Sequence, residues 1–312
     1  MLFPILLFIA GLLIIIVAGD KFVDASVSIA KRLGVSELII GATVVSLGTT
    51  LPEVLVSTTA SFSGSADIAI GNALGSIICN TAFIAGLTQF IRPAKDIDAS
   101  ALRWRAFFFF AAEIIILVFG LGSGHYGLAA GLILVSMFFL YTWLNISMEK
   151  SEDGPADSEE AKQPILGHIC MLAISALLLF IGAKLLVDNG IILARALGVP
   201  ERVIAVTIIA LGTSLPELVT AITALIKGHA AVSVGNILGA NILNLLLVIG
   251  IPAVIRGITP SVSAVQLDIP VSILVMAVLT LPMLTKRRGY RAQGGLLLLI
   301  YAGYCTYTFI GG

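Results

Sequence analysis

The sequence carries little charge for a chain of 312 residues. Charged side chains make up 12% of it, Lys and Arg together equal Asp and Glu at 18 each, and the mean hydropathy is +1.08. A soluble domain has about twice that charged fraction, which excludes an ordinary soluble globular protein. The net charge of zero, without a basic face, gives no indication of a nucleic-acid partner.

Cysteine and histidine are also scarce, at three residues each. Cys79, Cys170 and Cys305 all fall in apolar segments and show no CxxC or Cys/His spacing, so we interpret them as small buried residues. No Ser/His, Asp/Asp or HExxH arrangement lies within the apolar segments, since the three histidines fall near segment ends. We therefore expect neither an enzyme nor a protein that needs a cofactor.

What the sequence does contain is long apolar runs, close to the ~20 residues that a helix needs to cross a bilayer. The runs are continuous rather than alternating, which favours helices over a membrane barrel. The first run has no basic leader or cleavage site, so we expect a retained helix rather than a signal peptide. The predicted fold is an all-α membrane protein with ten transmembrane helices, at 2–19, 37–62, 66–91, 101–121, 126–146, 164–187, 200–226, 229–255, 263–284 and 292–310. Helices one and six are expected to continue toward Arg32 and Arg195.

The chain contains an internal repeat. Gly48-Thr-Thr-Leu-Pro-Glu53 returns as Gly212-Thr-Ser-Leu-Pro-Glu217, and residues 18–86 align with 182–250 at a constant offset of 164. Each copy belongs to a set of five apolar segments, and an odd number forces the second set to enter the membrane upside down. We predict a first five-helix repeat at 1–146, an acidic linker at 147–163, and a second, inverted repeat at 164–312.

The lysines and arginines predict the orientation of the chain. Most of them fall in the connections that face inward if the N-terminus lies outside. Because cytoplasmic loops carry the excess of Lys and Arg, we predict extracellular termini and a cytoplasmic linker, in the plasma membrane. Beyond the lipid bilayer and ions, no protein partner is indicated.

Each copy of the repeated string places oxygen-bearing side chains on one face of a helix. The first copy contributes Ser46, Thr49, Thr50, Glu53 and Ser57, and the second contributes Ala210, Thr213, Ser214, Glu217 and Ala221. Pro52 and Pro216 lack an N–H, which frees the carbonyls of Gly48 and Gly212 and predicts that helices two and seven are broken. An acid inside a membrane segment is a functional candidate by default.

The segments that follow add amides to this set. They carry Asn72, Ser76 and Asn80 in the first repeat and Asn236, Ala240 and Asn244 in the second. The pairs Gly71/Gly75 and Gly235/Gly239 allow close helix approach. Carboxylate, hydroxyl, amide and carbonyl oxygens are the ligands that a hard cation such as Ca²⁺ prefers, and two carboxylates balance its charge.

Three further acids lie in or near apolar segments. Glu113 has no counterpart in the second repeat, and we expect it to pair with a basic group near the interface or to face a crevice. Asp24 and Asp188 lie near the membrane boundary, where a structural role is expected.

These motifs resemble the two signatures of the cation/Ca²⁺ exchanger superfamily, and the resemblance covers nearly the whole chain. It implies that Glu53 and Glu217 lie at the centre of a diamond of cation sites. It also implies the surrounding ligands, which are the side chains of Thr49, Thr50, Ser76, Asn80, Thr213, Ser214 and Asn244, with backbone oxygens near Ser46 and Ala210.

Two positions depart from the acidic pattern of some prokaryotic exchangers. Asn244 stands where they have an aspartate and Ala240 where they have a serine, which weakens an outward-side Na⁺ site and argues against K⁺ dependence. The resemblance implies exchange of Na⁺ for Ca²⁺ by alternating access, with Ca²⁺ efflux driven by Na⁺ entry. Exchange of H⁺ for Ca²⁺ or another divalent cation remains the alternative, and a cation channel is a third possibility.

Overall fold

The computed structural model describes residues 2–64, 68–148, 165–198 and 212–311, and these residues are almost entirely helical. The first half contains, with η marking π-helical segments, α1 (Leu2–Leu33), α2 (Glu37–Ile40), η1 (Gly41–Val45), α3 (Ser46–Phe62), α4 (Ile68–Ile78), η2 (Cys79–Ala85), α5 (Gly86–Ile91), α6 (Ala99–Gly122) and α7 (Leu128–Met148). The second half contains α8 (Ile165–Ala196), α11 (Leu215–Ile226), α12 (Ala230–Leu243), η5 (Asn244–Ile249), α13 (Gly250–Ile255), η6 (Ala264–Asp268), α14 (Ile269–Lys286) and α15 (Arg291–Gly311).

Eight of the described helical units are long and apolar enough to cross a membrane. The two remaining predicted segments correspond to α11, with 12 residues, and α15, with 21. Helices α1 and α8 both run for 32 residues, to Leu33 and Ala196, as the sequence predicted. The fold is therefore an all-α membrane fold with eight to ten apolar helices. Most of the predicted linker, residues 149–163, lies outside the described residues.

The helix that carries Glu53 continues through its proline. We expected an interruption at Gly48–Pro52, but Pro52 lies inside α3, and the irregular turn is η1, just before it. One proline removes a single backbone hydrogen bond, and the turns on either side are enough to keep the helix continuous. In the second half, α11 begins at Leu215 with Pro216 in its first turn, where a missing N–H costs nothing.

Two further π-helical segments occupy matching places in the two halves. Segment η2 begins at Cys79 and η5 begins at Asn244, and the offset of 164 residues pairs Asn80 with Asn244. Such widened turns are rare and are often found at functional sites. Both predicted amide ligands thus stand at a local irregularity of their helix.

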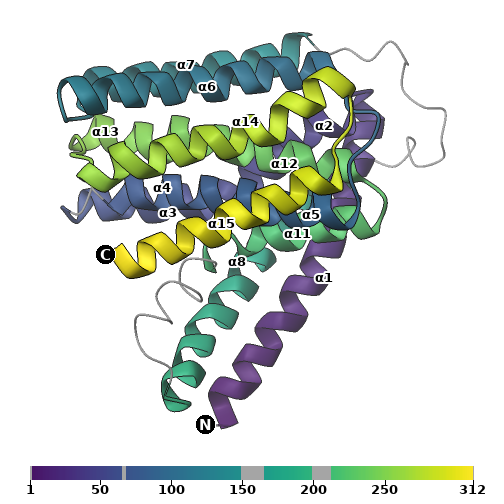
Figure 1. Cartoon of the computed structure of the whole chain (residues 1–312). Coiled ribbons are helices and arrows are strands. Elements are labelled where there is room, and N and C mark those ends of the chain that lie inside the picture. The colour runs from purple at the N-terminus through teal and green to yellow at the C-terminus, as the bar shows by residue number, and fades with distance from the viewer. Residues whose placement is uncertain (1, 65–67, 149–164, 199–211, 312) are drawn as a thin grey trace.

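Helices α1 and α8 form a pair that is inclined to the other helices (Figure 1). Their backbones meet at two glycines. A Cβ atom on Gly11 would lie 2.8 Å from the backbone nitrogen of Leu186, and one on Gly182 would lie 3.0 Å from that of Ile15. The absence of side chains at these two positions allows the close crossing.

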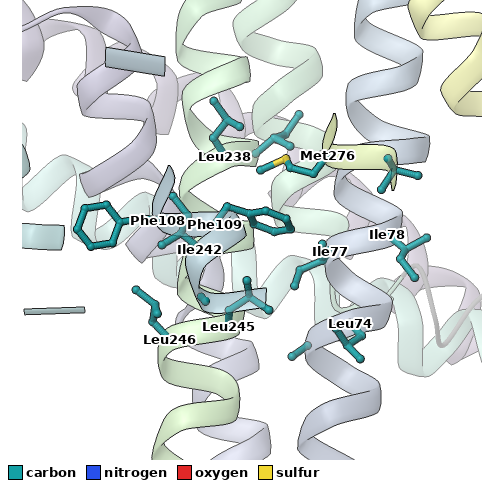
Figure 2. Packing of buried hydrophobic residues seen from close by; sticks show 14 of the residues in the cluster. Leu74, Ile77, Ile78, Phe108, Phe109, Leu238, Ile242, Leu245, Leu246 and Met276 are labelled. Carbon is teal, nitrogen blue, oxygen red and sulfur yellow. The ribbon is translucent and has the colours of Figure 1, made fainter. Parts of the chain in front are cut away.

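The remaining helices share one large apolar core. Figure 2 shows part of it, where side chains of α4, α6, α12, η5 and α14 interdigitate around Phe109, Ile242 and Met276. The unit Ala230–Ile255 lies at the centre, with 89% of its most apolar window buried, against 22% for α1 and for α8. The α1–α8 pair packs against the other helices through a second, smaller cluster, in which Ile15, Phe22 and Leu179 meet Val45 of η1 and Ala224 of α11.

Candidate cation site

Two buried glutamates form the centre of the candidate site. Glu53 on α3 and Glu217 in the first turn of α11 are 1% and 0% exposed, and they lie close enough to interact electrostatically. Neither oxygen of either carboxyl group has a hydrogen-bond partner among the described residues. Buried charges are paired or coordinate metal ions, so this pair of acids requires a cation or protons.

Neutral oxygens without partners lie on the segments that carry the two acids or pack against them. The Thr50 and Ser214 hydroxyls and the side-chain oxygens of Asn80 and Asn244 are buried and accept no hydrogen bond within the described chain. Ser214 occupies the N-cap position of α11 without using its hydroxyl as a cap. Because most buried polar atoms in native proteins are hydrogen-bonded, this concentration of unpartnered oxygens indicates a ligand site.

A chain of hydrogen bonds holds the two halves together at the site. The Thr49 hydroxyl lies 3.1 Å from Asn236 Oδ1, and the Asn236 amide donates to the Thr220 hydroxyl at 3.0 Å. Thr49 also lies beside Glu217, which belongs to the other half. The predicted ligand Thr49 is therefore at the site, and Asn236 and Thr220 position it.

A second amide network fixes Asn80. Its amide donates to Asn241 Oδ1 at 3.4 Å, and the Asn241 amide donates to the Thr81 hydroxyl at 2.6 Å. This arrangement uses the amide group of Asn80 and leaves its oxygen available. Sequence reasoning missed Asn241, because its counterpart in the first half is Ile77 and the repeat gives no signal there.

The other predicted residues differ in how they are placed. Ser46 is buried, but its hydroxyl donates to the Thr43 carbonyl at 3.1 Å, while its own carbonyl lies 3.3 Å from the Thr49 hydroxyl. Ser76 is buried on α4. Thr213 is only half-buried and lines a cavity of about 330 Å³ between α3, α8 and α11. Ala210 lies outside the described residues.

Ser57 serves a supporting role on α3. Asn72 donates to the Ser57 hydroxyl at 2.9 Å, across from α4 to α3. In the second half Asn236 makes the equivalent bond from α12 to α11, but to Thr220, one residue before the counterpart Ala221. The Thr220 hydroxyl thus takes the place of the hydroxyl that Ala221 lacks.

Helix α12 approaches η1 and α3 at backbone distance. A Cβ atom on Gly41 would lie 2.5 Å from the Val232 carbonyl, and one on Gly239 would meet the Ala42 carbonyl and the Ser46 hydroxyl. The predicted close approach at Gly235 and Gly239 is therefore confirmed. At Gly71 and Gly75 a Cβ would meet no described residue within 4 Å.

Glu113 is not part of this site. It is fully buried on α6, where its carboxyl group contacts Ser272, and it forms no ion pair in the part of the chain that the structure describes. The expectation of a basic partner or a crevice was therefore wrong. The group that Glu113 contacts is neutral, the Ser272 hydroxyl of α14.

The site's donor set suits a hard cation. No cluster of three or more His, Cys, Asp and Glu side chains that could hold a metal occurs within the described ranges. The available ligands are two carboxylates and neutral oxygens from hydroxyl, amide and carbonyl groups. Ca²⁺ and Na⁺ bind oxygen ligands of this kind, whereas softer metals prefer sulfur or imidazole.

Comparison with known proteins agrees with this chemistry. A family model described as sodium/calcium exchanger protein matches residues 3–147 and 167–310. The chain is 33% identical to the inner membrane protein YrbG of Escherichia coli, over 98% of this chain and 96% of the relative. It is 29% identical to the sodium/calcium exchanger MaX1 of Methanosarcina acetivorans, over 97% and 98%.

Its structure is similar to that of the sodium-calcium exchanger NCX_Mj. The TM-score is 0.85 at 28% sequence identity, and the match covers 98% of each chain. The chain therefore belongs to the sodium/calcium exchanger family, and it is an ion transporter of the membrane rather than an enzyme.

Proposed function

We propose that the protein exchanges Na⁺ for Ca²⁺ by alternating access, and that Ca²⁺ leaves the cell as Na⁺ enters. The observation that carries this proposal is the pair Glu53 and Glu217, buried together with all four carboxylate oxygens unpartnered in the described chain. One Ca²⁺ neutralises both carboxylates. The NCX_Mj structures, obtained with Na⁺ and with Ca²⁺ or Sr²⁺, support the same choice of ions.

We assign the ion ligands as follows. The two glutamates bind every transported ion, and neutral oxygens complete the coordination shells. Thr50, Asn80, Ser214 and Asn244 have the clearest support, because their oxygens are buried without partners. Thr49 and Ser76, the backbone oxygens near Ser46 and Ala210, and Thr213 beside its cavity complete the proposed set.

Electrostatics explains why such a site performs antiport. Two bare carboxylates in a low-dielectric site repel each other strongly, so the empty form resists closing and crossing the membrane. Either Ca²⁺ or several Na⁺ relieve this repulsion. Because both kinds of ion need Glu53 and Glu217, they compete, and loading by one replaces the other.

We propose that the two halves are inverted repeats, at 1–146 and 164–312, joined by a cytoplasmic linker at 147–163. The matching π-helical segments η2 and η5 support this, as do the equivalent bonds of Asn72 to Ser57 and of Asn236 to Thr220. The Lys and Arg distribution favours extracellular termini and a place in the cell membrane. The predicted interruption of helix seven lies at Gly212–Pro216, where α11 begins, and residues 199–211 before it lie outside the described residues.

The moving element in this proposal is the α1–α8 pair. It packs against α2, η1, α11 and α12 through a small cluster that is distinct from the large core. The cavity of about 330 Å³ lies between α8 and the site helices, and Pro52, Thr213 and Pro216 line it. Sliding of α8 would open or close this approach to the glutamates.

Flux measurements with separate ion gradients test the proposal. The purified protein in lipid vesicles should take up Ca²⁺ when a Na⁺ gradient is imposed, and not with a K⁺ gradient alone. Uptake driven by a pH gradient in Na⁺-free buffer would support H⁺/Ca²⁺ exchange instead. Ca²⁺ flux that needs no counter-ion would indicate a channel.

A further inference from the structure

A third buried acid lies away from the cation site. Glu113 on α6 is 0% exposed, and so is Ser272 on α14, the helix that packs against it. The Ser272 hydroxyl oxygen lies 2.5 Å from Glu113 Oε1. This contact joins two helices of the large core.

The single hydrogen of the Ser272 hydroxyl limits how this contact can be made. The hydroxyl oxygen also lies 2.8 Å from the Ile269 carbonyl, the usual back-bond of a helical serine. A serine hydroxyl has one hydrogen, and it can serve only one of these two acceptors. If the back-bond takes it, the short contact with Glu113 needs a second hydrogen, and only a protonated carboxyl group can supply one.

The surroundings of Glu113 also favour the neutral acid. Its Oε2 has no hydrogen-bond donor in the described residues, and no Lys, Arg or His forms an ion pair with it there. An ionised carboxylate in such a position would have the single Ser272 hydroxyl as its only donor among the described residues, and no compensating charge there.

A titratable group of another described segment also faces Glu113. Tyr126 is buried within electrostatic range of it, and the phenol oxygen, also without a partner in the described chain, lies against Gly120, seven residues further along α6. Backbone bonds of 2.8 and 2.9 Å to Ile258 hold Tyr126 in place. Asp268 lies one turn before Ser272 and accepts a hydrogen bond from the Tyr304 hydroxyl.

We propose that Glu113 is a proton-binding site, separate from the cation site. Its carboxyl group stays protonated and donates a hydrogen bond to the Ser272 hydroxyl. This hydrogen bond joins α6 to α14 in the large core. The proton stays bound throughout ion exchange, so Glu113 adds no charge to those that Glu53 and Glu217 present to the ions. This inference does not depend on which ions the protein transports.

Infrared spectroscopy of the full-length protein in vesicles tests the proposal without any transport assay. At neutral pH the difference spectrum between wild type and E113Q should show the C=O band of a protonated carboxyl group. Carboxylate bands in its place would overturn the proposal. E113Q should also keep the wild-type initial rate of Ca²⁺ flux, because glutamine is neutral and can donate to Ser272, whereas loss of most of the flux would indicate an ionised, ion-binding Glu113.

A second variant covers the case in which E113Q fails to fold. In S272A the Glu113 carboxyl group loses its acceptor, so the same C=O band should shift to the frequency of a weaker hydrogen bond. S175A is the matched control, because Ser175 is also buried and back-bonded in its helix, at 2.7 Å to Met171. An unshifted band in S272A would contradict the proposed donation.

Discussion

Thr49 of α3 and Asn236 of α12 connect the two halves of the protein by a hydrogen bond of 3.1 Å. Thr49 stands one turn before Glu53 in the sequence, yet it lies beside Glu217. The surroundings of one glutamate are thus built partly from the other half. We therefore expect a substitution of Thr49 or Asn236 to alter the surroundings of both glutamates.

Removing the Thr49 hydroxyl should weaken ion binding. T49V preserves the shape of the side chain but leaves the buried Asn236 oxygen unpaired, which should lower stability by about 1–3 kcal/mol. It also removes a neutral oxygen beside Glu217, so the apparent Ca²⁺ affinity should fall. The Ca²⁺ dependence of the initial exchange rate measures this. T43V is the control, because Thr43 only donates to the Ile39 carbonyl of its own helix. Equal affinities for the two variants would contradict the role of Thr49.

The two halves carry unequal numbers of hydroxyls at matching positions of the proposed ligand set. Ser76 is buried on α4, whereas its counterpart on α12 is Ala240, also fully buried. A240S should strengthen Na⁺ binding on the second-repeat side and lower the Na⁺ concentration that half-inhibits Ca²⁺ uptake. S76A should raise the Na⁺ concentration that half-inhibits Ca²⁺ uptake. If neither substitution changes Na⁺ competition, these two positions do not line a Na⁺ site.

The contact between α12 and α3 should tolerate no added side chain. G239A places a methyl group against the Ala42 carbonyl and the Ser46 hydroxyl, and overpacking of this kind costs about 1–3 kcal/mol. We expect a lower melting temperature in detergent and reduced exchange. G303A is the control, because a Cβ at Gly303 on α15 meets no described atom within 4 Å. Wild-type stability of G239A would show that the helices separate without cost.

Lys227 forms ion pairs that connect α1 to the end of α11. Its ammonium group lies 2.6 Å from Asp20 and 2.6 Å from Asp24 of α1, while Lys227 itself follows α11. The aspartates are about half exposed, so the pairs should contribute less than about 1 kcal/mol to stability.

K227M should therefore change the maximal exchange rate, which depends on motion of α1, more than it changes Ca²⁺ affinity or thermal stability. K21M is the control, since the Lys21 side chain lies 3.9 Å from Asp20, its neighbour in the same helix. A change in affinity at constant maximal rate would argue against a mobile α1.

The sequence was sufficient to predict the apolar helices and to single out the two glutamates that the structure buries close together. Apolar runs predicted the extended helices α1 and α8, and the duplicated string identified Glu53 and Glu217, because chance seldom places an acid twice within apolar runs at a fixed offset. Those signals depend only on local composition and spacing. The role of Ser46 was less clear, since the choice between its hydroxyl and its carbonyl depends on the helix turn before it.

Features that depend on packing between helices could not be predicted. The bond that Asn236 donates to Thr220 corresponds to the bond that Asn72 donates to Ser57, but its acceptor lies one residue away from the repeat register. Asn241 has an apolar counterpart, and only its proximity to Asn80 reveals its role. Pro52 was expected to break its helix, yet the irregular turn lies at Gly41–Val45, where α12 packs closely.

The central claim is that Glu53 and Glu217 together bind the exchanged ions, and two isosteric substitutions test it most directly. Na⁺-driven Ca²⁺ uptake into vesicles should be abolished in E53Q and in E217Q, since each removes one of the two charges that balance Ca²⁺. T43V should keep its flux under the same conditions. Substantial Na⁺-driven uptake in either glutamine variant, with the protein folded and inserted, would contradict the account.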